Sequence, residues 1–248
     1  MEEKTNPYPL CKNCNEQVQG NYCSNCGQPS KLRRIDKQYI LHDISEFFLT
    51  NKGLFYTIKK VLVSPGESVK QFIAEDRYRF VKPITFVIIT SLIYTLINHL
   101  FQIRAEDYYE NPNIELGSTV ALMMKWMFTD YPGYANLISG LFTAFWIKIF
   151  FKKANYNIFE IFVLLCFVTG IGTLYMSVAA IIQGTTHLKI LQEASYLGMI
   201  YITWAVGQFF DKKKATSYIK AFLSYILGSI VLGFLIGIVG TIIDTIKL

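Results

Sequence analysis

Four cysteines near the N-terminus form the most specific chemical pattern in the sequence. They stand in two Cys-x-x-Cys pairs with eight residues between the pairs: Cys11, Cys14, Cys23 and Cys26. Each pair fits one tight turn that presents two thiolates, so two turns together can supply four ligands to one tetrahedral ion. Four protein ligands leave no coordination position for a substrate or a reactive water. The pattern therefore predicts one structural Zn²⁺.

The residues around the cysteines agree with such turns. Asn15 follows the first pair and Gly27 the second, and both residue types tolerate the positive φ that lets backbone N–H groups point at the sulfurs. Gly20-Asn21 predicts the tip of a small hairpin between the pairs. About thirty residues bury too little apolar surface to fold alone, and a bound metal would supply the missing free energy. We interpret residues 1–30 as a zinc ribbon.

Two disulfides or an iron site are the alternatives to zinc. The first ten residues contain Glu2 and Glu3 and lack the basic and apolar regions of a signal peptide, which predicts a cytosolic head. A reducing cytosol argues against disulfides. Four thiolates can hold iron as well as zinc, so iron remains an alternative identity for the metal.

The rest of the chain has the composition of a membrane protein. Of its 248 residues, 52% are hydrophobic and 17% are charged, and the apolar residues form long blocks. Each block is long enough to cross a bilayer as a helix. We therefore expect a mainly α-helical multi-pass membrane domain over residues 84–248, with about five transmembrane helices, at 84–103, 134–151, 158–183, 190–210 and 221–243.

The basic residues predict how the chain is threaded. The net charge of +6 gathers beside the apolar blocks, where membrane orientation places it, and this distribution argues against a nucleic-acid-binding face. Lysines follow the second span at Lys152-Lys153 and the fourth at Lys212–Lys214. Basic residues remain on the cytoplasmic side. This indicates a cytosolic N-terminus and an outside C-terminus.

Residues 31–83 connect the head to the first span. Apolar residues recur there at helical spacing and predict short amphipathic helices at 36–50, at 54–62 and after Ser64, where Glu67 completes a capping box behind Pro65. Such helices either lie on the bilayer surface or pack on one another as a small cytosolic domain. We favour the surface arrangement. The residues expected to face anionic lipid are Lys59, Lys60, Arg77, Arg79 and Lys82.

Four segments in order resemble a family of bacterial zinc-ribbon-headed multi-pass membrane proteins of unknown function. These segments are Tyr22-Cys23-Ser24-Asn25-Cys26-Gly27-Gln28, Lys52-Gly53-Leu54-Phe55-Tyr56-Thr57, Ser64-Pro65-Gly66 and Arg77-Tyr78-Arg79-Phe80-Val81-Lys82-Pro83. The resemblance implies the family's fold and a location in the bacterial cytoplasmic membrane, but no reaction. Family members usually carry a glycine and a basic residue where Ala74, Glu75 and Asp76 stand. This departure argues against an anion-binding role for that turn.

Polar residues inside the predicted spans are the remaining functional candidates. Asn98 and His99 lie in the outer half of the first span, and Glu193 lies early in the fourth. Glu193 and His99 stand at similar depth and could pair. No Ser/His/Asp, Cys/His or paired-carboxylate arrangement is present, which predicts that the protein is not an enzyme.

Two functions remain from this pattern. In the first, the protein is a membrane-anchored scaffold or interaction protein, and the zinc ribbon engages a cytosolic protein partner. In the second, it is a small transporter or a lipid-handling protein that uses Asn98, His99 and Glu193. Glycines in the last span allow close helix approach, either within the bundle or between copies in a homo-oligomer. These glycines are Gly228, Gly233, Gly237 and Gly240.

Overall fold

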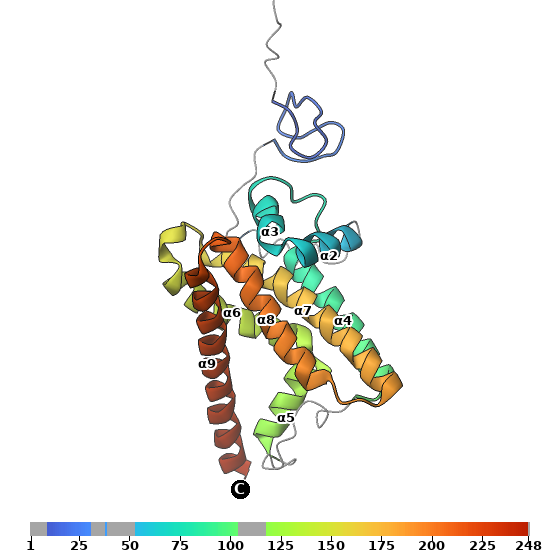
Figure 1. Ribbon diagram of the computed structural model, residues 1–248, viewed down its shortest axis with the longest axis vertical. Coiled ribbons are helices and arrows are strands. Elements are labelled where there is room, and N and C mark those ends of the chain that lie inside the picture. The colour runs from blue at the N-terminus through green and yellow to red at the C-terminus, as the bar shows by residue number, and fades with distance from the viewer. Residues whose placement is uncertain (1–8, 31–37, 39–52, 104–117, 248) are drawn as a thin grey trace, which may run out of the picture.

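A computed structural model of the chain describes residues 9–30, 38, 53–103 and 118–247. Over these residues, a small cysteine-rich head stands at one end of a helical bundle, and the C-terminal end of α9 lies at the other (Figure 1). The expected helix at 36–50 and the basic residues between the head and that helix fall outside the described residues, apart from Gln38. The described chain is mainly helical, as the sequence predicts.

The head is built from two isolated antiparallel bridges. Leu10 pairs with Gln17 and Tyr22 with Pro29, so each bridge closes one cysteine pair. This differs from the predicted hairpin with its tip at Gly20-Asn21. That dipeptide joins the two turns, and the antiparallel pairing lies within each half of the head.

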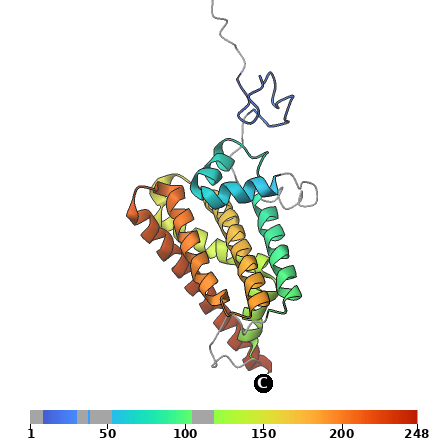
Figure 2. The same cartoon turned by 45° about the vertical axis from the view of Figure 1, so that its right-hand side comes forward.

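Over the described ranges, five long helices form the bundle and run alternately away from the head and back (Figures 1 and 2). They lie where the five apolar blocks were expected: α4 Pro83–Leu100, α6 Pro132–Phe150, α7 Ile158–Thr186, α8 Leu191–Asp211 and α9 Ala215–Lys247. Among the described helices, three have the length and apolarity of membrane spans, at Pro83–Leu100, Ile158–Thr186 and Ala215–Ile246. These three are consistent with membrane association.

Helix α7 is the centre of the bundle. It is hydrophobic on all sides, as a helix surrounded by others must be, and it packs against α4, α6 and α8. Its Phe167 contacts the rings of Phe72, Phe80 and Phe86. Helix α9 covers α6 and α8 on the outside, and most of its apolar surface faces away from the protein.

Two short helices close the end of the bundle that faces the head (Figure 2). These are α2, Leu54–Val63, and α3, Pro65–Ala74, which pack on one another and on α7 and α8. The Tyr201 hydroxyl of α8 donates a 2.9 Å hydrogen bond to the carbonyl of Val61. The two connector helices that the structure describes thus pack on the bundle, while Phe55 of α2 remains 85% exposed.

The start of α3 differs in one detail from the sequence prediction. Pro65 occupies the first turn as expected, but the Ser64 side chain makes no capping hydrogen bond, so the capping box with Glu67 is not formed. The hydroxyl of Ser68 instead donates to the carbonyls of Ser64 and Lys60, at 2.7 and 2.8 Å. A hydroxyl one turn into α3 therefore joins α3 to the end of α2.

Shorter elements complete the connections. Helix α5, Thr119–Lys125, continues into a π-helical turn, η2, Trp126–Asp130, and both lie at the end of the bundle far from the head. The Asp244 carboxylate of α9 accepts hydrogen bonds from the backbone N–H and the hydroxyl of Thr119, which fixes the start of α5. A 3-10 turn, η3, Lys152–Ala154, links α6 to α7.

Candidate metal centre

The structure brings the four predicted ligands together. The Sγ atoms of Cys11 and Cys26 are 3.5 Å apart, as are those of Cys14 and Cys23, and all four sulfurs lie within 4.8 Å of one another. A tetrahedron with metal–sulfur bonds of about 2.3 Å has edges of about 3.8 Å. The spacing of the sulfurs therefore fits one tetrahedral metal ion.

Local backbone geometry holds the cysteines in place. Asn15 and Gly27 adopt φ of 60° and 75°, which confirms the positive φ expected after each pair. Their N–H groups donate 2.9 Å hydrogen bonds to the carbonyls of Cys11 and Cys23. Val18 is buried against the cysteines and is part of the small core of the head. The two halves of the head thus repeat one turn, each presenting two sulfurs.

The thiols have strongly different proton affinities. The backbone N–H groups of Cys26 and Asn25 lower the pKa of Cys23 to about 7. The pKa of Cys14 is raised to about 12, because burial and the neighbouring sulfurs outweigh the lowering effect of the N–H of Glu16. Four thiolates at these distances repel one another unless a cation lies between them. The donor set therefore suits a divalent soft-ligand metal.

Such a metal would hold the head together and leave no position for chemistry. All four ligands come from one segment, Cys11 to Cys26, and the site is closed when four sulfurs bind. When bound, the metal would supply cross-linking of the two turns, in place of the large apolar core that the head lacks. The site has the character of a structural metal centre.

Two hydrogen bonds seat the head on the bundle. The amide of Gln28, which is 3% exposed, donates to the carbonyl of Glu75 at 2.6 Å. The guanidinium of Arg79 donates to the carbonyl of Asn13, also at 2.6 Å. Both bonds join the head to the turn after α3. The sequence analysis did not predict this contact. The one local hint in the sequence is Gln28 itself, an uncharged polar residue directly after the second cysteine turn.

The turn after α3 is organised by a buried acid. Asp76 is 1% exposed, and its carboxylate accepts hydrogen bonds from the N–H groups of Tyr78 and Arg79, at 3.1 and 3.3 Å. The Arg79 Nε lies 3.7 Å from the same carboxylate. The Asp76 carboxylate thus occupies the backbone N–H groups that a bound anion would need. This agrees with the sequence argument against anion binding there.

The predicted lipid-facing cations have different surroundings. Arg77 donates to the carbonyls of Phe72 and Ile73 in the last turn of α3, and Arg79 contacts Asp76 and the head. Lys59 and Lys60 lie on the exposed side of α2, and Lys82 is partly buried just before α4. The two arginines thus bind protein groups, and lipid binding by these five residues stays a prediction.

The intramembrane candidates do not form one site. Asn98 is buried, and within the described chain its amide oxygen and nitrogen have no hydrogen-bond partner. His99 and Glu193 are exposed and are not paired with each other. The suggested His99–Glu193 pair is therefore not formed, because α4 and α8 each pack against α7 and are not packed side by side.

Comparison with protein families adds one finding. Residues 51–95 match DUF3667, a protein family of unknown function. The match confirms the resemblance to an uncharacterised family. It covers a segment that includes α2, α3, the turn after α3 with Asp76, and most of α4. The cysteines lie outside the matched DUF3667 segment. Neither the curated proteins nor the solved structures gave a match to the chain.

Close backbone approaches explain two glycines of the DUF3667 segment. Gly53 has φ of 100°, and a Cβ at this position would collide with the carbonyl of Arg79. A Cβ at Gly66 would lie 2.6 Å from backbone atoms of Gln208 and Phe209 in α8. Gly53 thus packs directly on the turn after α3, and Gly66 packs directly on the end of α8, with no room for a side chain at either position.

Proposed function

We propose that this protein is a membrane-anchored interaction protein whose metal-loaded head engages a cytosolic protein partner. The observation that carries the proposal is the seat of the head. Its metal turns are joined to the bundle through Gln28 and Arg79, while Leu10 and Tyr22 are 61% and 68% exposed on the head. Tyrosine is enriched among the residues that anchor protein interfaces, which favours Tyr22 as the main contact point.

We infer that the metal is Zn²⁺. A closed site of four cysteines with tetrahedral spacing is the usual form of structural zinc. Zinc has no redox chemistry and no preferred geometry beyond the one that the ligands impose, which suits a site that only holds two turns together. This role supports a binding protein in place of an enzyme.

We also propose that the head is cytosolic, that the C-terminus lies outside, and that the protein resides in the bacterial cytoplasmic membrane. The basic connections at Lys152-Lys153 and Lys212–Lys214 lie at the head end of the bundle (Figure 1). Lys212 also donates to the Glu67 carboxylate of α3 at 2.9 Å. Basic residues gathered at one end support an orientation with that end inside.

Site-specific photo-crosslinking in native membranes tests the interaction. A benzoylphenylalanine at Tyr22 should give one discrete protein adduct, and the same group at Tyr78, exposed on the bundle side, is the matched control. The adduct should disappear in Cys23→Ser and persist in His99→Ala and Glu193→Gln. An adduct that survives the loss of the metal would overturn the proposal.

The alternative, a small transporter or lipid-handling protein acting through Asn98, His99 and Glu193, predicts the reverse pattern. In that case flux would be lost in His99→Ala and Glu193→Gln and kept in Cys23→Ser. The exposed positions of His99 and Glu193 do not favour a pathway through this pair.

A further inference from the structure

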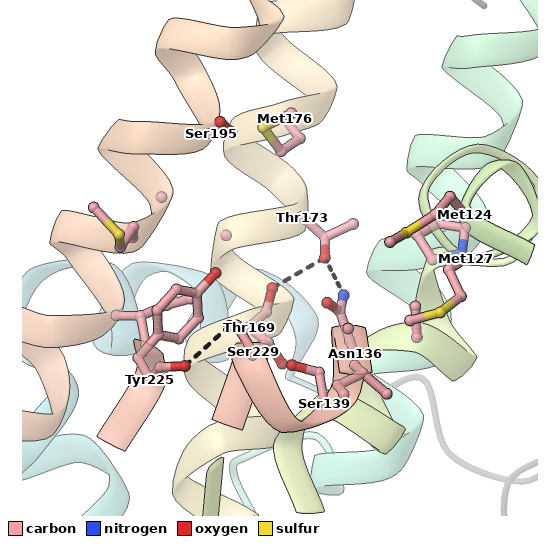
Figure 3. Close-up of a pocket in the computed structure, with 18 of the residues that line it drawn as sticks. Met124, Met127, Asn136, Ser139, Thr169, Thr173, Met176, Ser195, Tyr225 and Ser229 are labelled. Atoms are coloured by element: carbon pink, nitrogen blue, oxygen red, sulfur yellow. Dashed lines mark hydrogen bonds between the residues drawn. The ribbon is translucent and has the colours of Figure 1, made fainter. Parts of the chain in front are cut away.

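A partly open cavity of about 450 Å³ lies between the helices of the bundle (Figure 3), and no residue of the cysteine-rich head lines it. Its lining residues come from α4, α5, η2, α6, α7, α8 and α9, and they include Thr173 near the middle of α7 and Ser229 near the middle of α9. The volume falls within the range of about 300–1,000 Å³ that is typical of small-molecule sites. The cavity is therefore large enough for a ligand.

One side of the cavity carries a connected set of hydrogen-bonding groups (Figure 3). The Asn136 amide of α6 donates to the Thr173 hydroxyl at 2.8 Å, and this hydroxyl donates to the carbonyl of Thr169 at 3.0 Å. The hydroxyls of Ser139 and Ser229 lie beside this group. An amide and several hydroxyls thus converge from three helices, which can orient the polar end of a ligand.

Methionines provide much of the apolar lining. Four of the chain's six methionines line the cavity, namely Met124, Met127, Met176 and Met199. Unbranched, polarisable thioether side chains adapt to irregular apolar shapes. In Figure 3, Met124 and Met127 lie to one side of Asn136, and Met176 lies near Thr173 on the same helix. Adaptable apolar side chains thus adjoin the fixed polar group.

Within the part of the chain that the structure describes, no charged side chain lines the cavity. None of its lining residues is Asp, Glu, Lys, Arg or His. An ion placed there would lose part of its hydration without gaining an opposite charge from the described lining. The lining therefore selects against charged ligands.

Glycines keep the cavity open. A Cβ at Gly172 of α7, Gly198 of α8 or Gly233 of α9 would meet no atom within 4 Å, and all three line the cavity. By contrast, a Cβ at Gly228 or Gly240 would clash with Thr143 or Val120. The close helix approach expected of the last-span glycines thus occurs at Gly228 and Gly240 and not at Gly233. The three cavity glycines are not required by helix packing.

We propose that this cavity binds an uncharged amphiphile, with a hydroxyl- or carbonyl-bearing end at Asn136 and Thr173 and an apolar body against the methionines. The site is independent of the metal head and of the proposed protein partner. Its ligand class follows from the described lining: uncharged hydrogen-bonding groups at Asn136 and Thr173, next to thioether side chains.

Photoaffinity labelling with 1-octanoylglycerol that carries a diazirine in its acyl chain tests this site in the full-length protein in nanodiscs. Labelling of peptides containing Met176 or Met199 should saturate and be competed by unlabelled 1-octanoylglycerol. The phosphate analogue with the same chain should give no saturable labelling of these peptides. Equal saturable labelling by the charged analogue would overturn the ligand class.

Matched variants localise the site. Gly233→Leu places a side chain in the cavity and should reduce labelling about tenfold. Gly237→Leu is the control on the same helix: a Cβ at Gly237 also meets no atom within 4 Å, but Gly237 does not line the cavity. This variant should label as wild type. Thr173→Val keeps the shape and removes a hydroxyl, so it should weaken competition several-fold. Labelling that Gly233→Leu and Thr173→Val both leave intact would exclude the cavity. Cys23→Ser should label normally, which separates this test from that of the head.

Discussion

The side-chain amide of Gln28 donates a 2.6 Å hydrogen bond to the backbone carbonyl of Glu75, and the backbone carbonyl of Gln28 accepts the N–H of Cys23 at 2.8 Å. One residue therefore both shapes the second cysteine turn and holds the head on the bundle. Because Gln28 is buried, its amide has little access to water as an alternative partner. The seat of the head depends on the fold of the metal turn.

Gln28→Ala should release the head without removing the metal. The Cys23 N–H keeps its backbone acceptor, but the bond to Glu75 is lost, at a cost of about 1–2 kcal/mol. Hydrogen–deuterium exchange of the turn at residues 76–79 should accelerate about tenfold, while metal content is unchanged. Ser30→Ala, which removes an exposed hydrogen bond to Asn21, is the control and should leave exchange in that turn as in wild type.

Replacing both Cys23 and Cys26 by serine should remove the metal. Protein purified under reducing conditions should contain about one zinc per chain by elemental analysis, and the double variant should contain none. Cys166→Ser, which changes a buried cysteine of α7 that is not part of the four-cysteine cluster, should keep the zinc. Iron in place of zinc, or wild-type protein without metal, would contradict the prediction.

Asp76→Ala should destabilise the turn that carries the head. The carboxylate is buried and accepts two backbone N–H groups, and its loss leaves both without a partner, at a cost of about 2–3 kcal/mol. The thermal unfolding temperature in detergent should fall clearly. Glu75→Ala changes the neighbouring, exposed acid and should have little effect. Equal unfolding temperatures of the two variants would show that the carboxylate does not organise the turn.

Patterns of neighbouring residues predict the metal ligands and the helical blocks, because cysteine spacing and apolar length are local properties. The Gln28–Glu75 contact joins residues 47 positions apart, and nothing in either local sequence specifies the other. The His99–Glu193 hypothesis used depth alone, whereas a contact also requires the two helices to be neighbours, and α4 and α8 each pack on α7. The cavity could not be predicted for a similar reason: its walls come from separate helices, and its open glycines look the same in sequence as packed ones.

The ion pair between Lys212 and Glu67 should show in the titration of the carboxyl group. A hydrogen bond from Lys212 and its charge lower the pKa of Glu67 below its ordinary 4.5. The pair is therefore fully present above pH 4.5 and is lost as the pH falls through the lowered pKa. Carboxyl ¹³C NMR should show that the pKa of Glu67 rises in Lys212→Gln. Lys213→Gln is the matched control, and an equal pKa in both variants would contradict the pairing.

Gly66→Ala should separate α3 from α8. The added Cβ would lie 2.6 Å from the backbone of Gln208 and Phe209, and backbone atoms within a helix cannot move aside as a side chain can. Overpacking of this kind typically costs about 1–3 kcal/mol. We expect a lower unfolding temperature and faster exchange at Val61 of the adjoining helix α2, whose carbonyl accepts the Tyr201 hydroxyl of α8. Gly237→Ala, where a Cβ meets no atom within 4 Å, should be neutral or slightly stabilising because alanine favours helix. The same unfolding temperature in both variants would show that the close approach of α3 to α8 does not hold α2 and α3 on the bundle.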